Sequence, residues 1–139
     1  MTAASYAPEA YRRTQVEGAD RKYLVVLLMQ ALLTFLGRAG RAIEQRNWEA
    51  KARALDRARA VLTELGCSLD ESKGGDLARN LQRLYAHWQT RLVAIDLSDD
   101  QADLARLQDA VGKLADAWQE AFERCRAQAT EAQPSPAAR

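Results

Sequence analysis

The sequence predicts an all-α protein, an antiparallel up-down four-helix bundle with disordered N- and C-terminal tails. Ala, Leu, Arg, Glu, Asp and Gln dominate, most of them good helix formers, whereas the chain of 139 residues holds only 7 glycines and 3 prolines. Apolar residues recur at intervals of three and four in four stretches of roughly 20 residues, as in helices that bury one side. The expected division is a flexible segment at 1–18, a bundle at 19–126 and a disordered tail at 127–139.

The first expected helix contains an apolar run, Tyr23–Leu36, that has almost no polar side. Only Gln30 and Thr34 interrupt it, and Asp20 is placed to cap the amides that precede it. A membrane-spanning helix needs roughly 18 or more apolar residues, so the run is too short to span. A helix on the surface of a small domain normally keeps one polar face. The run must therefore be covered on more than one side, by the fold, by a partner or by both.

The second expected helix follows Asn47, which is an N-cap residue with Trp48 and Glu49 in the first turn after it. Alanines in this helix also form a small-residue stripe that would let a neighbouring helix approach closely. The expected core stripe is Trp48, Ala52, Leu55, Ala58 or Arg59, Leu62, Leu65 and Leu69.

The third and fourth expected helices each begin after a recognisable sequence signal. Gly74-Gly75 supplies backbone freedom that a helix interior does not need, so the third helix is expected from about Asp76 to Ile95. Ser98 followed by Gln101 has the form of a capping box that opens the fourth. The expected stripes are Leu77, Leu81, Leu84, Trp88 and Ile95 in the third helix, with Ala78, Tyr85 and Leu92 beside them, and Leu104, Leu107, Val111, Leu114, Trp118, Ala121 and Cys125 in the fourth.

Charge and cysteine content limit the function classes. The net charge is +1, which gives no electrostatic case for nucleic acid or an anionic membrane surface. Cys67 and Cys125 lie far apart without metal or redox spacing, which is typical of free thiols in a reducing compartment. Met1–Gln15 lacks the apolar stretch of a secretory signal. The expected location is the cytoplasm.

The residues that catalysis would need are missing. The chain has 1 histidine, so it cannot supply the two Glu-x-x-His pairs of a di-iron bundle. His87 has no Ser or Cys elbow around it, and Gly74-Gly75 lacks the rest of a phosphate-binding loop. His87 could serve in a phosphotransfer bundle, but the lysine and glycine that follow such a histidine are absent. No enzyme activity, metal or cofactor is expected.

One ordered series of short motifs points to a family. Its members are Ser68-Leu69-Asp70, Gly74-Gly75, Leu77-Ala78, Asn80-Leu81, Leu84-Tyr85 and Arg91-Leu92, with Phe35-Leu36, Ala42-Ile43 and Ala117-Trp118 at greater distance. With this series the chain resembles the FliS family of flagellin-specific export chaperones, and the likeness extends from about Tyr11 to Phe122. The chain departs from the family pattern at Asp20-Arg21, where Ser-Pro is usual, and at Met29-Gln30-Ala31, where Tyr-Asp-Gly is usual.

The resemblance implies a non-enzymatic function. Family members bind the disordered C-terminal segment of flagellin in the cytosol, prevent its premature polymerisation and present it to the type III export gate. The candidate partners are therefore the flagellin segment, the export gate and other flagellar regulators. The protein is then expected as a monomer or weak homodimer. The alternative is a self-associating helical adaptor without a flagellin client, in which a second copy covers the apolar excess.

The expected client groove is formed by the first three helices. Periodicity leaves open which apolar side of the first helix is core and which is groove. By resemblance, Tyr11 and Val16 would form an N-terminal latch that lies over the groove until client displaces it. The candidate client-binding residues are Leu24, Val25, Leu28, Met29, Leu32, Phe35, Tyr85 and Leu92.

Overall fold

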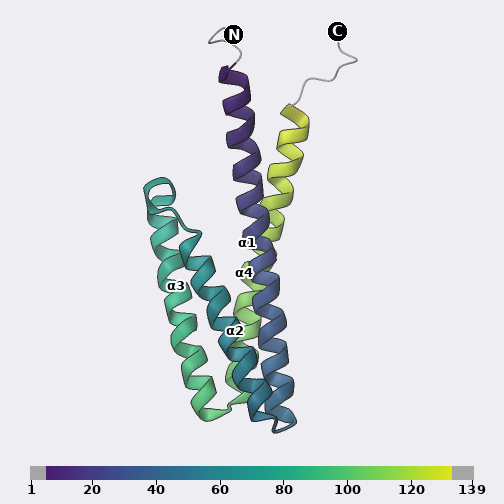
Figure 1. Ribbon diagram of the computed structural model, residues 1–139, viewed down its shortest axis with the longest axis vertical. Coiled ribbons are helices and arrows are strands. Elements are labelled where there is room, and N and C mark those ends of the chain that lie inside the picture. Colours follow the sequence, from purple (N-terminus) through teal and green to yellow (C-terminus); the bar gives the residue numbers. More distant parts are fainter. Residues whose placement is uncertain (1–5, 133–139) are drawn as a thin grey trace.

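Four α-helices joined by short loops make up the described part of the chain in the computed structural model (Figure 1). The structure describes the backbone of residues 6–132 and the side chains of residues 20–131. The helices are α1 (Tyr6–Glu44), α2 (Trp48–Cys67), α3 (Glu71–Ser98) and α4 (Gln101–Ala132). The described part of the chain contains helices and no strands, so the all-α prediction is confirmed.

The helices form an antiparallel bundle in which neighbours in the sequence are neighbours in space. α1 packs against α2 and α4, α3 packs against the same two helices, and the pairs α1–α3 and α2–α4 lie on the diagonals. Figure 1 shows that the α2–α3 hairpin leans away from the α1–α4 pair at the end where α2 meets α3. The α1–α4 pair continues past that end. The bundle is therefore closed at one end and splayed at the other.

Every helix contributes to one continuous core. On α1, Met29, Leu32 and Leu36 point into the bundle and are almost fully buried, whereas Leu24 and Leu27 lie on the opposite side and are exposed. The apolar run is thus covered on its inner side only. The other large core residues are Leu55, Leu62, Leu65, Tyr85, Trp88, Leu92, Ile95, Leu104, Leu107 and Val111.

The outer helices are longer than predicted. α1 begins at Tyr6 instead of Asp20, and α4 continues to Ala132, past the expected start of the tail at 127. Pro8 does not prevent the early start, because the first turn of a helix needs no N–H donor there. The predicted tail residues 133–139 lie outside the described residues. The division into flexible segment, bundle and tail stays a prediction.

The start of α3 also differs from the prediction. α3 begins at Glu71 instead of Asp76, and the Asp70 carboxylate caps it by accepting a hydrogen bond from the Ser72 N–H at 3.0 Å. Gly75, with φ 54° and ψ −126°, interrupts the helix within its first turns. The Gly-Gly pair is therefore a kink and not a loop.

Two local predictions about caps and stripes have different outcomes. Asn47 caps α2 as predicted, because its Oδ1 accepts from the Ala50 N–H at 3.1 Å. The cap of α4 is Asp100, which accepts from Ala102 and Asp103, and the predicted cap Ser98 instead accepts from the Asp100 N–H at 3.2 Å. The helix begins later than the capping-box pattern suggested, because Asp99 in the left-handed region ends α3 first.

One part of α1 has the length and composition of a membrane span. The segment Asp20–Glu44 passes that test, as a core helix of a soluble protein also does. The run Tyr23–Leu36 is itself shorter than a span, and the segment reaches that length because α1 continues beyond the run to Glu44. Its inner side packs in the bundle core.

Candidate functional site

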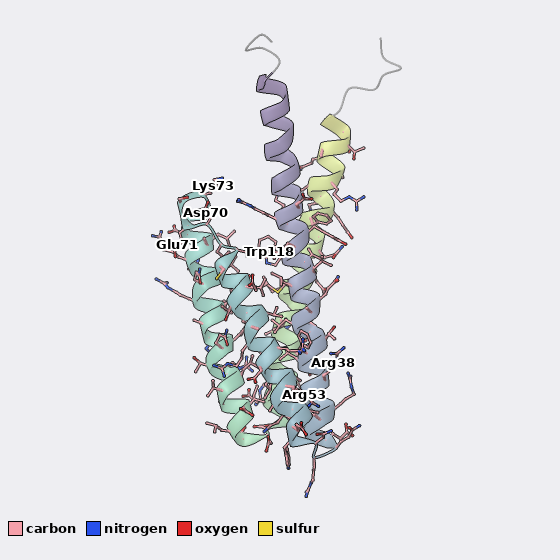
Figure 2. The ribbon with its side chains drawn as sticks, viewed as in Figure 1. Arg38, Arg53, Asp70, Glu71, Lys73 and Trp118 are labelled. Atoms are coloured by element: carbon pink, nitrogen blue, oxygen red, sulfur yellow. The ribbon has the colours of Figure 1, made fainter. Side chains whose placement is uncertain are left out.

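An apolar groove lies where the α2–α3 hairpin leans away from α1 and α4. Its volume is about 300 Å³, at the lower end of the range for binding pockets. Figure 2 shows Trp118 between the hairpin and α1, with Asp70, Glu71 and Lys73 at the hairpin end. The residues that line this hairpin groove are Arg21, Lys22, Val25, Ser68, Leu69, Asp70, Lys73, Gly74, Leu77, Ala78, Leu81, Tyr85 and Trp118.

The kink at Gly75 shapes the hairpin side of the groove. A positive φ of 54° suits glycine and would strain other residues. A Cβ atom on Gly74 would come within 2.9 Å of the Ala78 Cβ, so the first turns of α3 can pack this tightly only with glycine. As a result Leu69, before the kink, and Leu77, after it, line the same space. Leu77 is 63% exposed and forms the accessible edge.

Two polar atoms lie within the apolar floor. Burial raises the pKa of Tyr85 to about 12, so its hydroxyl stays protonated to higher pH than that of an exposed tyrosine. The Nε1–H of Trp118 is buried and makes no hydrogen bond of good geometry among the described residues, although it lies close enough to the Tyr85 hydroxyl to oppose the effect of burial on the pKa of that group. A buried donor without an acceptor is unfavourable. An occupant that brings a carbonyl or carboxylate oxygen to Trp118 would therefore gain a hydrogen bond.

The rim of the groove is charged. Arg21, Lys22 and Lys73 contribute cations, and Asp70 contributes one carboxylate. The hydroxyl of Ser72 donates to Asp70 at 2.5 Å and holds the pKa of that carboxyl below its usual range. The rim therefore favours a segment whose apolar anchors are flanked by acidic or polar residues.

The structure distributes the predicted groove residues over three environments. Val25 and Tyr85 line the hairpin groove. Leu24 is exposed on the outer side of α1, where Leu28 and Phe35 are half-buried. The other three, Met29, Leu32 and Leu92, are core residues with at most 1% exposure, so a client reaches them only if the bundle opens. The latch residues Tyr11 and Val16 lie on α1, and their side chains are outside the described residues.

Sequence reasoning missed several groove residues as site candidates. Leu69, Leu77 and Leu81 were assigned to core stripes, and Trp118 to the core seam of the fourth helix. A signal was nevertheless present, because the family motifs contain nine of the thirteen lining residues, from Ser68 to Tyr85 and at Trp118. The motif series thus gathers around one space in the fold.

Comparison with known proteins assigns the family. The family model for "Flagellar protein FliS" matches residues 3–125. The chain belongs to the FliS family. It is 33% identical to flagellar secretion chaperone FliSB of Pseudomonas aeruginosa over 75% of this chain and 82% of that protein. It is 29% identical to FliS of Escherichia coli over 86% and 91% of the two chains, and 28% identical to FliS of Bacillus subtilis over 82% and 84%. The family resemblance is confirmed.

Proposed function

We propose that the protein is a cytoplasmic flagellar secretion chaperone that binds the C-terminal segment of flagellin in the hairpin groove. Its relatives in Escherichia coli, Pseudomonas aeruginosa and Bacillus subtilis are named flagellar secretion chaperones. The observation that carries the proposal is the convergence of the family motifs on an open apolar groove. No catalytic step is part of this function.

The groove suits an amphipathic segment that folds as it binds. Ordering a disordered segment costs entropy, so the interface must bury several large apolar side chains. The groove offers Leu69, Leu77 and Leu81 as contacts, and the exposed outer side of α1 adds Leu24 and Leu27. An amphipathic helix that lies in an apolar groove is a common recognition mode. The same burial covers the surface through which flagellin segments would otherwise associate, and keeps the client available for the export gate.

Replacing Leu77 with aspartate should weaken binding of a flagellin C-terminal peptide by at least about tenfold, measured by isothermal titration calorimetry. Burial of one leucine is worth roughly 1.5–3 kcal/mol, and 1.4 kcal/mol corresponds to tenfold in affinity. Leu77 is 63% exposed, so the variant should fold normally. Leu97→Asp is the matched control, because Leu97 is 83% exposed at the other end of the same helix.

The two variants separate the groove from general apolar exposure. The proposal requires that Leu97→Asp bind the peptide as the unchanged protein does. Equal losses in both variants would place the contact elsewhere. Absence of binding heat from the folded, unchanged protein at high micromolar concentration would reject the flagellin assignment. If sedimentation then showed a concentration-dependent dimer, the self-associating adaptor would replace it.

Starting the chain at Val16 should tighten peptide binding by about two- to tenfold if the N-terminal segment acts as a latch. A segment that covers the groove in part of the molecules lowers the apparent affinity for the peptide in proportion to the fraction of molecules left open. Figure 1 shows α1 continuing straight past the hairpin end. The N-terminal segment can therefore cover the groove only if α1 bends, and Gly18 is the residue that weakens the helix in this part of the sequence. Gly18→Ala should favour the straight helix and also tighten binding. Unchanged affinity in both proteins would reject the latch.

A further inference from the structure

A second groove lies between α1 and α2 at the closed end of the bundle, and four arginines line it. Its volume is about 560 Å³. Figure 2 shows Arg38 and Arg53 together on this pair of helices, far from Trp118 and the hairpin end. No residue of this arginine groove belongs to the hairpin groove. Its lining residues are Phe35, Arg38, Arg41, Ala42, Gln45, Ala50, Arg53, Ala54 and Arg57.

The charge of the arginine groove is out of proportion to that of the molecule. The whole chain carries a net charge of +1, yet four of the nine lining residues are arginine and none is acidic. Of these, Arg53 pairs with Glu49 at 3.1 Å, and both side chains are largely exposed. Within the described residues, Arg38, Arg41 and Arg57 take part in no ion pair. All four arginine side chains are exposed, so water weakens their mutual repulsion, and an anion between them would add charge-assisted hydrogen bonds.

Phe35 fixes two of the guanidinium groups over the floor of the groove. The Cζ of Arg38 lies 5.5 Å from the centre of the Phe35 ring, and that of Arg57 lies 6.0 Å from it. These are cation–π distances. Because the two arginines come from different helices, the phenyl ring holds charges from both walls beside one apolar floor. Ala42 and Ala54, both buried, complete that floor.

The spacing along each wall suits paired carboxylates. Arg38 and Arg41 are three residues apart on α1, and Arg53 and Arg57 are four apart on α2, so each pair shares one helix face. A guanidinium group presents a planar fork of donors that matches a carboxylate. Acidic side chains at intervals of three or four could therefore meet both walls, while an apolar side chain between them packs on Phe35.

We propose that the arginine groove is a docking site for an acidic peptide segment of a partner protein, distinct from the client groove. An acidic peptide fits better than a nucleic acid. Single-stranded nucleic acids need exposed aromatic faces for base stacking, whereas guanidinium groups already occupy the surroundings of Phe35. The chain also lacks the basic excess that phosphate-backbone binding requires. The site would let a partner hold the chaperone without displacing its client.

The test uses a fluorescein-labelled synthetic peptide made of Glu-Leu-Leu-Glu repeats, and the same peptide with Gln in place of Glu. Fluorescence anisotropy with the full-length protein, its hairpin groove saturated with unlabelled flagellin peptide, should show binding of the Glu peptide, weakening as salt is raised, and no comparable binding of the Gln peptide. The double variant Arg38→Glu/Arg57→Glu should bind the Glu peptide at least about tenfold more weakly. Arg83→Glu, an exposed arginine on α3, is the matched control and should change binding less than twofold.

Further measurements keep the proposal open to rejection. Arg38→Gln/Arg57→Gln removes the charges without reversing them, and should also weaken the Glu peptide if the fold by circular dichroism is unchanged. Both double variants should keep the affinity of the unchanged protein for the flagellin peptide. A failure of the acidic-peptide proposal can therefore be distinguished from a failure of the proposed client groove. Equal binding of Glu and Gln peptides, equal loss in Arg83→Glu, no binding at all, or tighter binding of a single-stranded oligonucleotide would each overturn the proposal.

Discussion

Met29→Ala should lower the free energy of unfolding by about 3 kcal/mol, measured by urea denaturation followed by circular dichroism. Met29 is 0% exposed in the centre of the core cluster, and truncation of a buried Leu, Ile or Met to Ala costs roughly 2–5 kcal/mol. A domain of this size has a stability of roughly 5–15 kcal/mol, so the variant should remain folded at room temperature.

The matched control is Leu27→Ala, two residues away on the same helix. Leu27 is 42% exposed on the outer side of α1, so its truncation removes little buried surface and should cost less than about 1 kcal/mol. A small effect of Met29→Ala together with weaker client binding would mean that Met29 belongs to a client surface. Because Met29 lies in the core, the structure predicts a loss of stability and unchanged client binding. A substitution at Met29, where the chain departs from the usual family triplet, should therefore affect the stability of the fold more than the choice of client.

This contrast shows what periodicity can and cannot decide. An apolar repeat of three and four residues predicts a helix because the period belongs to the helix itself. The side that is buried depends on the neighbouring helices when the run is apolar all round, as Tyr23–Leu36 is. The sequence therefore predicted the existence of the four helices correctly and left the inner side of α1 open. Only the packing of α2 and α4 places Met29 inside and Leu27 outside.

The candidate site was harder to predict for the same reason. Leu77 keeps the spacing of a core residue, but it is 63% exposed and belongs to the first turns of α3, which form part of the hairpin end that leans away from the α1–α4 pair (Figure 1). Trp48 also keeps core spacing and is nevertheless 48% exposed, with its ring 5.2 Å from the Nζ of Lys51. Both residues lie near a helix end. There the three-and-four spacing of apolar residues continues, although the neighbouring helix no longer covers those residues. Gly75 was assigned to a loop because a kink and a loop both need the same backbone freedom.

Lys51→Met should lower the free energy of unfolding by about 2 kcal/mol at pH 7, measured by urea denaturation. Lys51 is the buried charged residue of α2, and its Nζ lies 2.6 Å from the Asp99 carboxylate, 3.2 Å from that of Asp96 and 3.0 Å from the Asp96 carbonyl. It joins α2 to the α3–α4 turn, at the residue that ends α3. Methionine keeps the apolar stem and removes the donors, so the loss reports the polar contacts.

The cost should stay below the 3–5 kcal/mol typical of a fully buried broken pair. The Asp99 side chain is 34% exposed and that of Asp96 51%, so water can solvate both carboxylates once Lys51 is gone. Lys113→Met is the control, because Lys113 pairs with Asp109 on an exposed helix face and should contribute less than about 0.5 kcal/mol. Equal losses in the two variants would contradict a special role for Lys51.

The pH dependence gives an independent check on this ion pair. The hydrogen bond to Asp99 raises the pKa of Lys51 above its usual 10.5, with desolvation opposing it. A raised pKa in the folded state means that the stabilisation is complete below the unfolded pKa and is lost as pH rises through the folded value. The stability difference between the unchanged protein and Lys51→Met should therefore be constant from pH 7 to pH 9 and shrink above about pH 10.5. A difference that persisted unchanged at higher pH would show that packing of the side chain, and not its charge, stabilises the closed end.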